Sequence, residues 1–96
     1  MDALEVRLDQ DRLICFDGRV LEFFGAAPDK STGTKPPRFH VKLLAVEVED
    51  PDKKGIRTLS FRVPAYIAFL LCDEPAFERF QPMLDALRAA GVSVSP

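Results

Sequence analysis

Residues 25–31, GAAPDKS, superficially resemble a phosphate-binding loop of the form GxxxxGK[ST]. Such a loop wraps an anion with backbone N–H groups, needs a glycine immediately before the lysine, and leads into a helix. Here Asp29 stands at the glycine position, where its carboxylate would repel phosphate, and no helix start follows Ser31. The segment therefore does not predict nucleotide binding.

The single histidine and a group of carboxylates could offer acid–base or metal chemistry. His40 lies between apolar residues on an expected strand, without the orienting partner and cleft that a general base needs. Four carboxylates could resemble a Ca²⁺ site: Glu47, Glu49, Asp50 and Asp52. The first two share the outer face of a strand and the other two belong to a turn, so we interpret them as solvated. We expect no enzyme activity, no metal site and no cofactor.

The two cysteines, Cys15 and Cys72, lie far apart in apolar runs and show no CxxC or His/Cys ligand spacing. Nothing near them in sequence lowers a thiol pKa, which argues against a nucleophilic role. One disulfide between them is an alternative. We expect instead two unpaired, small, buried side chains in a reducing cytoplasm.

Residues 25–42 form the only locally basic part of the chain. Residues 25–37 are rich in Gly, Pro, Ser and Thr and predict a long flexible loop. The candidate anion- or lipid-binding residues are Lys30, Lys35, Arg38 and Lys42. Each charge contributes about 1 kcal/mol near an anionic membrane, which predicts weak, salt-sensitive contact with a membrane surface. We favour a loop that is merely solvated over one that binds a ligand.

Composition limits the class of protein. The chain has 96 residues, 47% of them hydrophobic and 29% charged, and a formal net charge of −2. These values are typical of a single globular domain spanning residues 1–96, and the acidic balance argues against a nucleic-acid partner. The longest apolar run, 65–72, is too short to cross a bilayer, and the N-terminus lacks a targeting pattern, so we expect a cytoplasmic protein.

Alternating apolar and polar residues predict strands through the first two thirds of the chain. The first covers residues 4–8, and a hairpin follows over 12–24, with Asp17-Gly18 as a two-residue turn that pairs Ile14 with Leu21. This hairpin is apolar on both faces, so another element or another copy of the chain should cover it.

Residues 38–63 predict a second, central hairpin. The apolar phase changes after Leu43, which requires a bulge or a sharp bend. The turn over residues 50–55 is rich in Asp, Pro and Gly, and pairing its ends places Val46 opposite Leu59. A bend of this kind favours a curled sheet over a flat one.

The last third of the chain predicts one strand and one helix. Residues 65–72 favour a strand, although periodicity alone also allows a short buried helix. Asp73 is a suitable N-cap for a helix that is kinked near Pro82 and ends at Gly91. The helix buries a stripe of Phe and Leu side chains, and the tail, residues 92–96, is expected to fray.

This order of elements resembles the pleckstrin-homology-like fold, in particular the small bacterial domains of that class. The resemblance rests on RLICFDGRVLEFF, RFHVKLLAVEVED, GIRTLSFRV and EPAFERFQPMLDALRAAG, and spans residues 4–91. It implies a mainly β domain, a partly open barrel of about seven antiparallel strands capped by a C-terminal helix. It also implies binding of phosphoinositides, peptides or proteins, but the strands beside the first loop lack the dense basic cluster of the lipid-binding members.

We therefore expect a non-enzymatic adaptor whose partner is a protein or peptide, bound at a strand edge or beside the C-terminal helix. Weak binding of an anionic lipid or phosphoryl ligand by residues 25–42 is the alternative. Self-association through an uncovered strand edge is a third interpretation.

Overall fold

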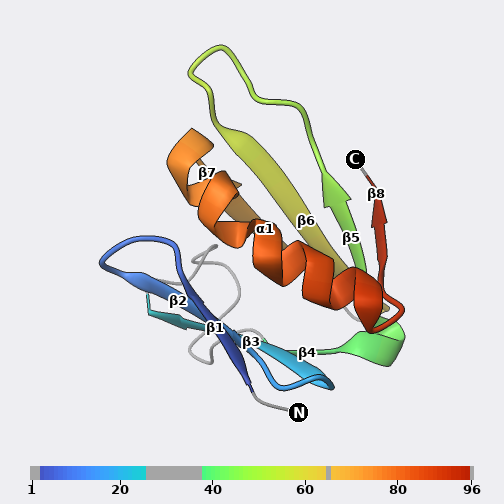
Figure 1. Cartoon of the computed structure of the whole chain (residues 1–96). Coiled ribbons are helices and arrows are strands. Elements are labelled where there is room, and N and C mark those ends of the chain that lie inside the picture. The colour runs from blue at the N-terminus through green and yellow to red at the C-terminus, as the bar shows by residue number, and fades with distance from the viewer. Residues whose placement is uncertain (1–2, 26–37, 65, 96) are drawn as a thin grey trace.

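The computed structural model describes residues 3–25, 38–64 and 66–95. In these residues eight strands form two four-stranded sheets, and one helix lies across them (Figure 1). The expectation of a mainly β chain with one C-terminal helix is confirmed. The expected number of about seven strands is corrected by an eighth strand after the helix, and the two sheets of the described residues do not close into a barrel.

The first sheet contains four antiparallel strands in chain order: β1 (Leu4–Arg7), β2 (Arg12–Phe16), β3 (Val20–Gly25) and β4 (Arg38–His40). The turn between β2 and β3 is wider than predicted, because the Asp17 carboxylate accepts hydrogen bonds from the N–H groups of Arg19 and Val20, both at 2.8 Å. Ile14 consequently pairs with Phe23, two residues from its predicted partner. The predicted register is wrong, but a shift of two leaves every side chain on its predicted face.

The second sheet has the order β7-β6-β5-β8 and contains β5 (Ala45–Val48), β6 (Arg57–Val63), β7 (Tyr66–Cys72) and β8 (Ser93–Ser95). Val46 pairs with Phe61 instead of Leu59, so this register also differs from the prediction by two residues. The cause is again an aspartate: Asp52 accepts the N–H groups of Lys54 and Ile56, at 2.8 and 3.0 Å, and closes the turn later than expected. The strand predicted over residues 65–72 is confirmed for the described residues 66–72, which form β7.

The predicted bend is the corner between the two sheets. A 3₁₀ helix, η2 (Val41–Leu43), ends the first sheet and leads into β5 of the second. The change of apolar phase therefore reflects a change of sheet, not a bulge within one strand. Leu43, predicted to belong to an apolar strand face, is exposed in this corner, whereas Leu44 after it is buried.

Helix α1 (Glu74–Ala89) runs through Pro82 as one helix, and the Asp73 carboxylate caps it by accepting the N–H of Ala76 at 2.9 Å. The expectation that the tail frays is wrong for residues 93–95. They form β8, which pairs in parallel with β5, because Gly91 turns the chain with φ 93° and Val92 is buried.

The core fills the space between α1 and the two sheets. Four phenylalanines from both sheets and the helix meet there, with ring centroids 5.0 Å apart for Phe23 and Phe61 and 6.2 Å apart for Phe61 and Phe80; the fourth is Phe39. Edge-to-face contacts between such rings stabilise a fold beyond the area that they bury. This cluster holds the two sheets against the helix.

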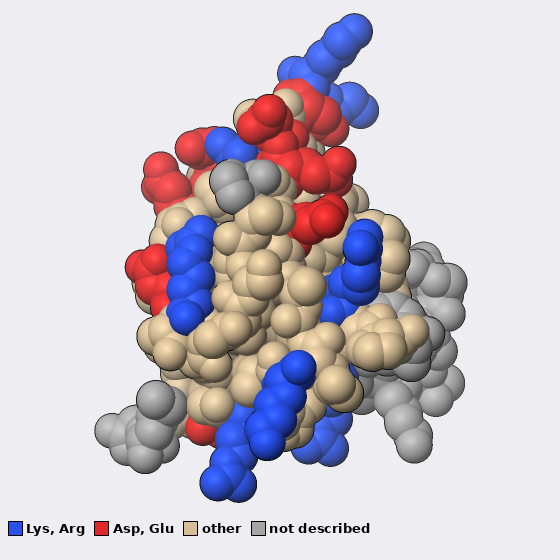
Figure 2. All heavy atoms as spheres, turned by 90° about the vertical axis from the view of Figure 1, so that its right-hand side faces the viewer, with Lys and Arg blue, Asp and Glu red and all other residues tan. Residues whose placement is uncertain are grey.

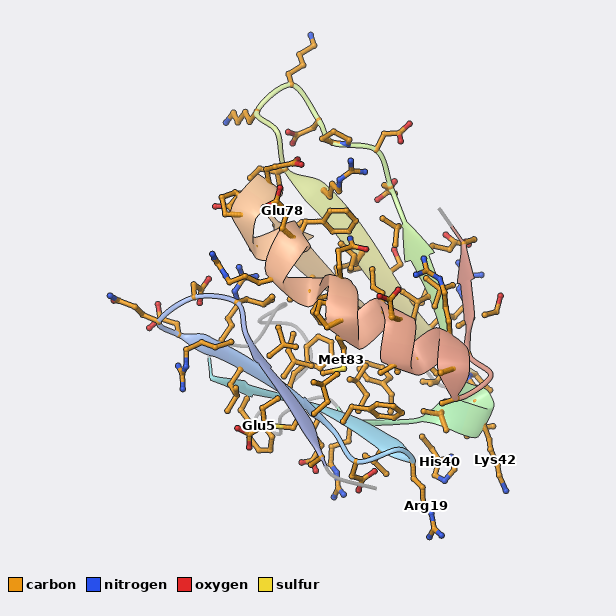
Figure 3. All side chains as sticks on the ribbon, viewed as in Figure 1. Glu5, Arg19, His40, Lys42, Glu78 and Met83 are labelled. Carbon is orange, nitrogen blue, oxygen red and sulfur yellow. The ribbon has the colours of Figure 1, made fainter. Side chains whose placement is uncertain are left out.

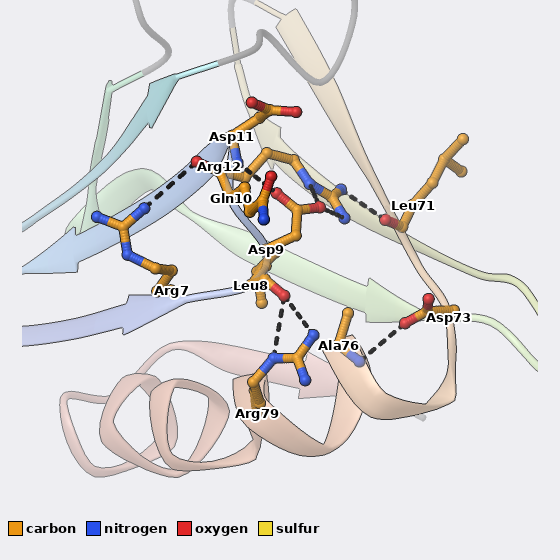
Figure 4. A network of polar contacts seen from close by, with 10 residues as sticks. All are labelled: Arg7, Leu8, Asp9, Gln10, Asp11, Arg12, Leu71, Asp73, Ala76 and Arg79. Atoms are coloured by element: carbon orange, nitrogen blue, oxygen red, sulfur yellow. Dashed lines mark hydrogen bonds and ion pairs between the residues drawn. The ribbon is translucent and has the colours of Figure 1, made fainter.

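Two arginines link the β1–β2 turn to the second sheet and to the helix (Figure 4). Arg12 pairs with Asp9 at 2.8 Å and donates a hydrogen bond to the carbonyl oxygen of Leu71 at 2.7 Å. Arg79 on α1 donates through Nε and Nη2 to the carbonyl oxygen of Leu8. At this side of the molecule the sheets are joined by side chains, whereas at the corner they are joined by the chain itself.

Candidate functional site

The predicted basic residues are only partly within the described chain. Lys30 and Lys35 lie outside the described residues. Arg38 is exposed at the start of β4, with its Nε 3.5 Å from a carboxylate oxygen of Glu22. Lys42 is exposed in the corner. Of the four candidates, the structure therefore describes two, and one of these is paired with an acidic side chain.

A basic residue that sequence reasoning missed lies beside this corner. The carbonyl oxygen of Arg19 accepts the N–H of Val41 at 2.9 Å, which brings the β2–β3 turn against η2. Figure 3 shows the side chains of Arg19, His40 and Lys42 at the same end of the molecule. The sequence placed Arg19 directly after the Asp17-Gly18 turn. Its contact with Val41 could not be predicted, because it depends on the pairing of β3 with β4.

His40 has the surface role predicted for it. Its side chain is exposed and Nδ1 accepts the backbone N–H of Lys42 at 3.3 Å. This bond fixes the first turn of η2 and leaves the ring at the molecular surface. It gives His40 a structural role in the corner.

A group of acidic residues lies toward the other end of the molecule. Figure 2 shows several acidic side chains toward the upper end, where Figure 1 places the β5–β6 turn, with basic side chains beside them at the very top and further basic side chains toward the lower end. A surface hollow there is lined by Glu47, Val48, Glu49, Asp50 and Ser95. Asp52 is occupied by its own turn, and the described part of the chain holds no group of three or more His, Cys, Asp or Glu that could bind a metal ion.

Both cysteines are unpaired thiols, as expected, but Cys15 is only partly buried, whereas both were expected to be buried. Cys72 is completely buried, and this desolvation raises its pKa to about 11. Partial burial, together with Glu5 and Glu22 nearby, also raises the pKa of Cys15. Neither thiol is activated as a nucleophile at neutral pH.

β7 has an apolar outer face. Its alternate residues Ile67, Phe69 and Leu71 are 39%, 41% and 52% exposed, whereas the residues between them are buried against the core. Three large apolar side chains in one row are a concentrated patch on a chain of this size, and such patches mark interaction surfaces.

The backbone of the same three residues points away from the sheet. The N–H of Glu49 donates to the carbonyl oxygen of Thr58 at 3.0 Å, so the backbone N–H and C=O groups of the even-numbered residues of β6 face β5 and those of the odd-numbered residues face β7. The register of β6 with β7 then turns the N–H and C=O groups of Ile67, Phe69 and Leu71 outward. We call these groups and their side chains the β7 edge. Within the described ranges no strand pairs with it, and Arg12 occupies one carbonyl at its end.

A groove also lies beside the C-terminal helix, between α1, the end of β5 and the start of β6. Arg57 of β6 enters it and lies over the ring of Phe77, with 4.5 Å between the guanidinium carbon and the ring centroid. Sequence reasoning assigned the Phe side chains of this helix, Phe77 among them, to a buried stripe. It did not single out Arg57, because the contact joins a helix to a strand whose register was not known.

Comparisons with models of protein families, with curated proteins and with solved structures gave no match to this chain. Among the described residues, no helix has the length and apolar character needed to cross a membrane.

Proposed function

We propose that this protein is a non-enzymatic binding module of the pleckstrin-homology-like class, and that it binds an extended segment of a partner protein along the β7 edge. The observation that carries the proposal is the coincidence, on three alternate residues, of exposed apolar side chains and outward backbone groups. The class is supported by the order of elements: seven antiparallel strands in two meanders precede the helix, and β8 is an addition.

An extended peptide can pair with the outward backbone groups of this edge and contact its exposed apolar side chains. Its backbone would pair with the N–H and C=O groups of Ile67 and Phe69, and alternate apolar side chains would lie beside Ile67, Phe69 and Leu71. Backbone pairing supplies affinity, and the row of side chains supplies preference for apolar residues at every second position. The opposite edge of the same sheet is β8, which is less suitable because it has only three residues and no row of exposed large apolar side chains.

The test is selection of a random peptide library on the immobilised protein, followed by amide hydrogen exchange with one selected synthetic peptide. We expect the selected sequences to alternate apolar and polar residues, and the N–H groups of Ile67 and Phe69 to become protected. Replacing Phe69 and Leu71 together by threonine should weaken binding at least about tenfold, since each loses buried apolar area worth ~1–2 kcal/mol.

The matched control is Phe24→Thr, which alters a phenylalanine of β3 that is 39% exposed, close to the exposure of Phe69. It should leave the affinity unchanged. Protection confined to another strand would overturn the assignment. A dimer of the protein alone, lost in the Phe69→Thr/Leu71→Thr variant, would show that a second copy occupies the edge in place of a partner.

Weak binding of an anionic lipid or phosphoryl ligand near the corner is the second candidate. It is supported by the exposed cations at this end, Arg19 and Lys42. The sequence also predicts an anion-binding role for Lys30, Lys35 and Arg38. Phosphatidylserine vesicles should then shift the amide signals of residues 38–42 at low salt and not at moderate salt. Unmoved signals at low salt would remove this candidate.

A further inference from the structure

The groove beside α1 has a volume of about 150 Å³ and combines an apolar wall with arginine side chains. Val48, Phe77 and Leu84 form the apolar part. A cavity of about this size accommodates a body such as a benzene ring. The groove is therefore large enough for a small organic group and too small for a folded partner.

Arg57 is held in the groove in one orientation. Its guanidinium stacks on Phe77, and Nη1 donates to the carbonyl oxygen of Glu49 at 3.3 Å. Stacking on the ring and a hydrogen bond at one corner fix the plane of the guanidinium. The side chain is thus positioned before any ligand arrives.

The other edge of this guanidinium has no partner in the described part of the chain. Nε is enclosed without a hydrogen-bond partner, and the only hydrogen bond of the group is the one from Nη1. Nε and Nη2 lie on the same edge of arginine and form the fork that binds a carboxylate with two parallel hydrogen bonds. An enclosed donor without a partner is rare in proteins and calls for a ligand or water.

Other polar side chains of the groove complement this fork. Arg88 adds a second positive charge, shared with Asp85 at 3.2 Å, and Gln81 adds an amide. Asp50 is the one acidic residue that lines the groove. An anion in the groove pairs with Arg57 and Arg88, whereas a cation would be repelled by both of them.

We propose that this groove binds a carboxylate carried on a small apolar body, with the carboxylate on the Nε–Nη2 fork of Arg57 and the body against Phe77 and Leu84. The source of such a group is either a free carboxylic acid or the C-terminal residue of a peptide. The proposal does not rest on the peptide proposed for the β7 edge, since the groove lies on the helix side of the second sheet.

The experiment is a titration of the ¹⁵N-labelled protein with 3-phenylpropionate and, separately, with its neutral amide. We expect the acid to shift the Arg57 Nε–H signal and the amides of residues 48–50 in a saturable way, and the amide to bind at least about tenfold more weakly, because a charge-assisted hydrogen bond is lost. Acetyl-Ala-Leu with a free C-terminus, compared with 3-phenylpropionate, then decides between the two sources by its relative affinity.

Arg57→Met should weaken binding of the acid about tenfold or more, and Arg57→Lys, which retains the charge without the fork, should also weaken it. The matched control is Arg62→Met, on the outer face of the same strand, which should bind as the wild type does. Equal binding of acid and amide, or equal binding by wild type and the two Arg57 variants, would overturn the proposal.

Discussion

The two faces of the second sheet differ sharply, although the same two strands build both. On the helix side β7 presents Ala68, Leu70 and Cys72, which are buried, and β6 adds Leu59 and Phe61. On the outer side β7 presents its exposed row of Ile67, Phe69 and Leu71, and β6 adds Thr58, Ser60 and Arg62.

Hydrophobicity alone does not distinguish these faces along β7, because both rows are apolar. What distinguishes them is the helix, which covers one and leaves the other. Substitutions in the inner row should therefore change stability, whereas substitutions in the outer row should change the binding that we propose.

The largest expected effect comes from Phe61→Ala. Phe61 contacts Phe23, Phe39 and Phe80 at the centre of the core, and removing such a ring costs about 3–5 kcal/mol of unfolding free energy. Phe69→Ala, on the outer face of the neighbouring strand β7, should cost less than about 1 kcal/mol. Urea denaturation of both variants measures the difference. Similar losses would mean that the outer face is covered in solution.

The two thiols should differ in reactivity. Burial raises the pKa of Cys72 to about 11 from its ordinary 9.0, so at pH 8 its thiolate is about a hundredfold scarcer than that of an unperturbed thiol. The buried thiol is also shielded from the reagent. Iodoacetamide should therefore modify Cys15 first and Cys72 only on unfolding, as peptide mass analysis would show. Rapid modification of Cys72 in the folded protein would contradict its place on the inner face.

The same shift gives a pH dependence. The folded chain holds the Cys72 proton more tightly than the unfolded chain, so this contribution to stability is complete below about pH 9 and is lost as the pH rises toward about 11. Cys72→Ala should remove that dependence. Thermal unfolding of both proteins across this range provides the measurement.

The smallest effects should separate the two arginines of β6. Arg57→Met loses the stacking on Phe77 and the hydrogen bond to Glu49, which together contribute about 1–2 kcal/mol. Arg62→Met loses only an exposed ion pair, 4.0 Å from Glu47, worth at most about 0.5 kcal/mol. Chemical denaturation should show a larger loss of unfolding free energy for Arg57→Met than for Arg62→Met. The reverse order would show that the contacts of Arg57 with Phe77 and Glu49 do not stabilise the fold.

Local sequence rules predicted most of the elements and their inward faces. Alternation located the strands, and Asp73 together with the apolar stripe located α1. Both hairpin registers failed by the same two residues, because the carboxylates of Asp17 and Asp52 captured backbone N–H groups and widened the turns. Hydrogen bonds of this kind depend on the geometry of the turn, which the residue types alone do not determine.

The candidate sites were less accessible from sequence. Ile67, Phe69 and Leu71 read as one strand face, but their exposure depends on which side α1 covers. Arg57 depends on a contact between β6 and α1, and β8 is too short a segment to show a strand period. Each of these features arises from packing between segments distant in the chain.

The strand order also has a consequence for how the chain folds. Within each sheet, β1 to β3 and β5 to β7 pair with their neighbours in sequence, so these contacts close short loops at low entropic cost and can form early. β8 is different, because it reaches β5 only after β6, β7 and α1 have been made. We expect this strand to dock last and to open first, with its amides exchanging faster than those of either meander.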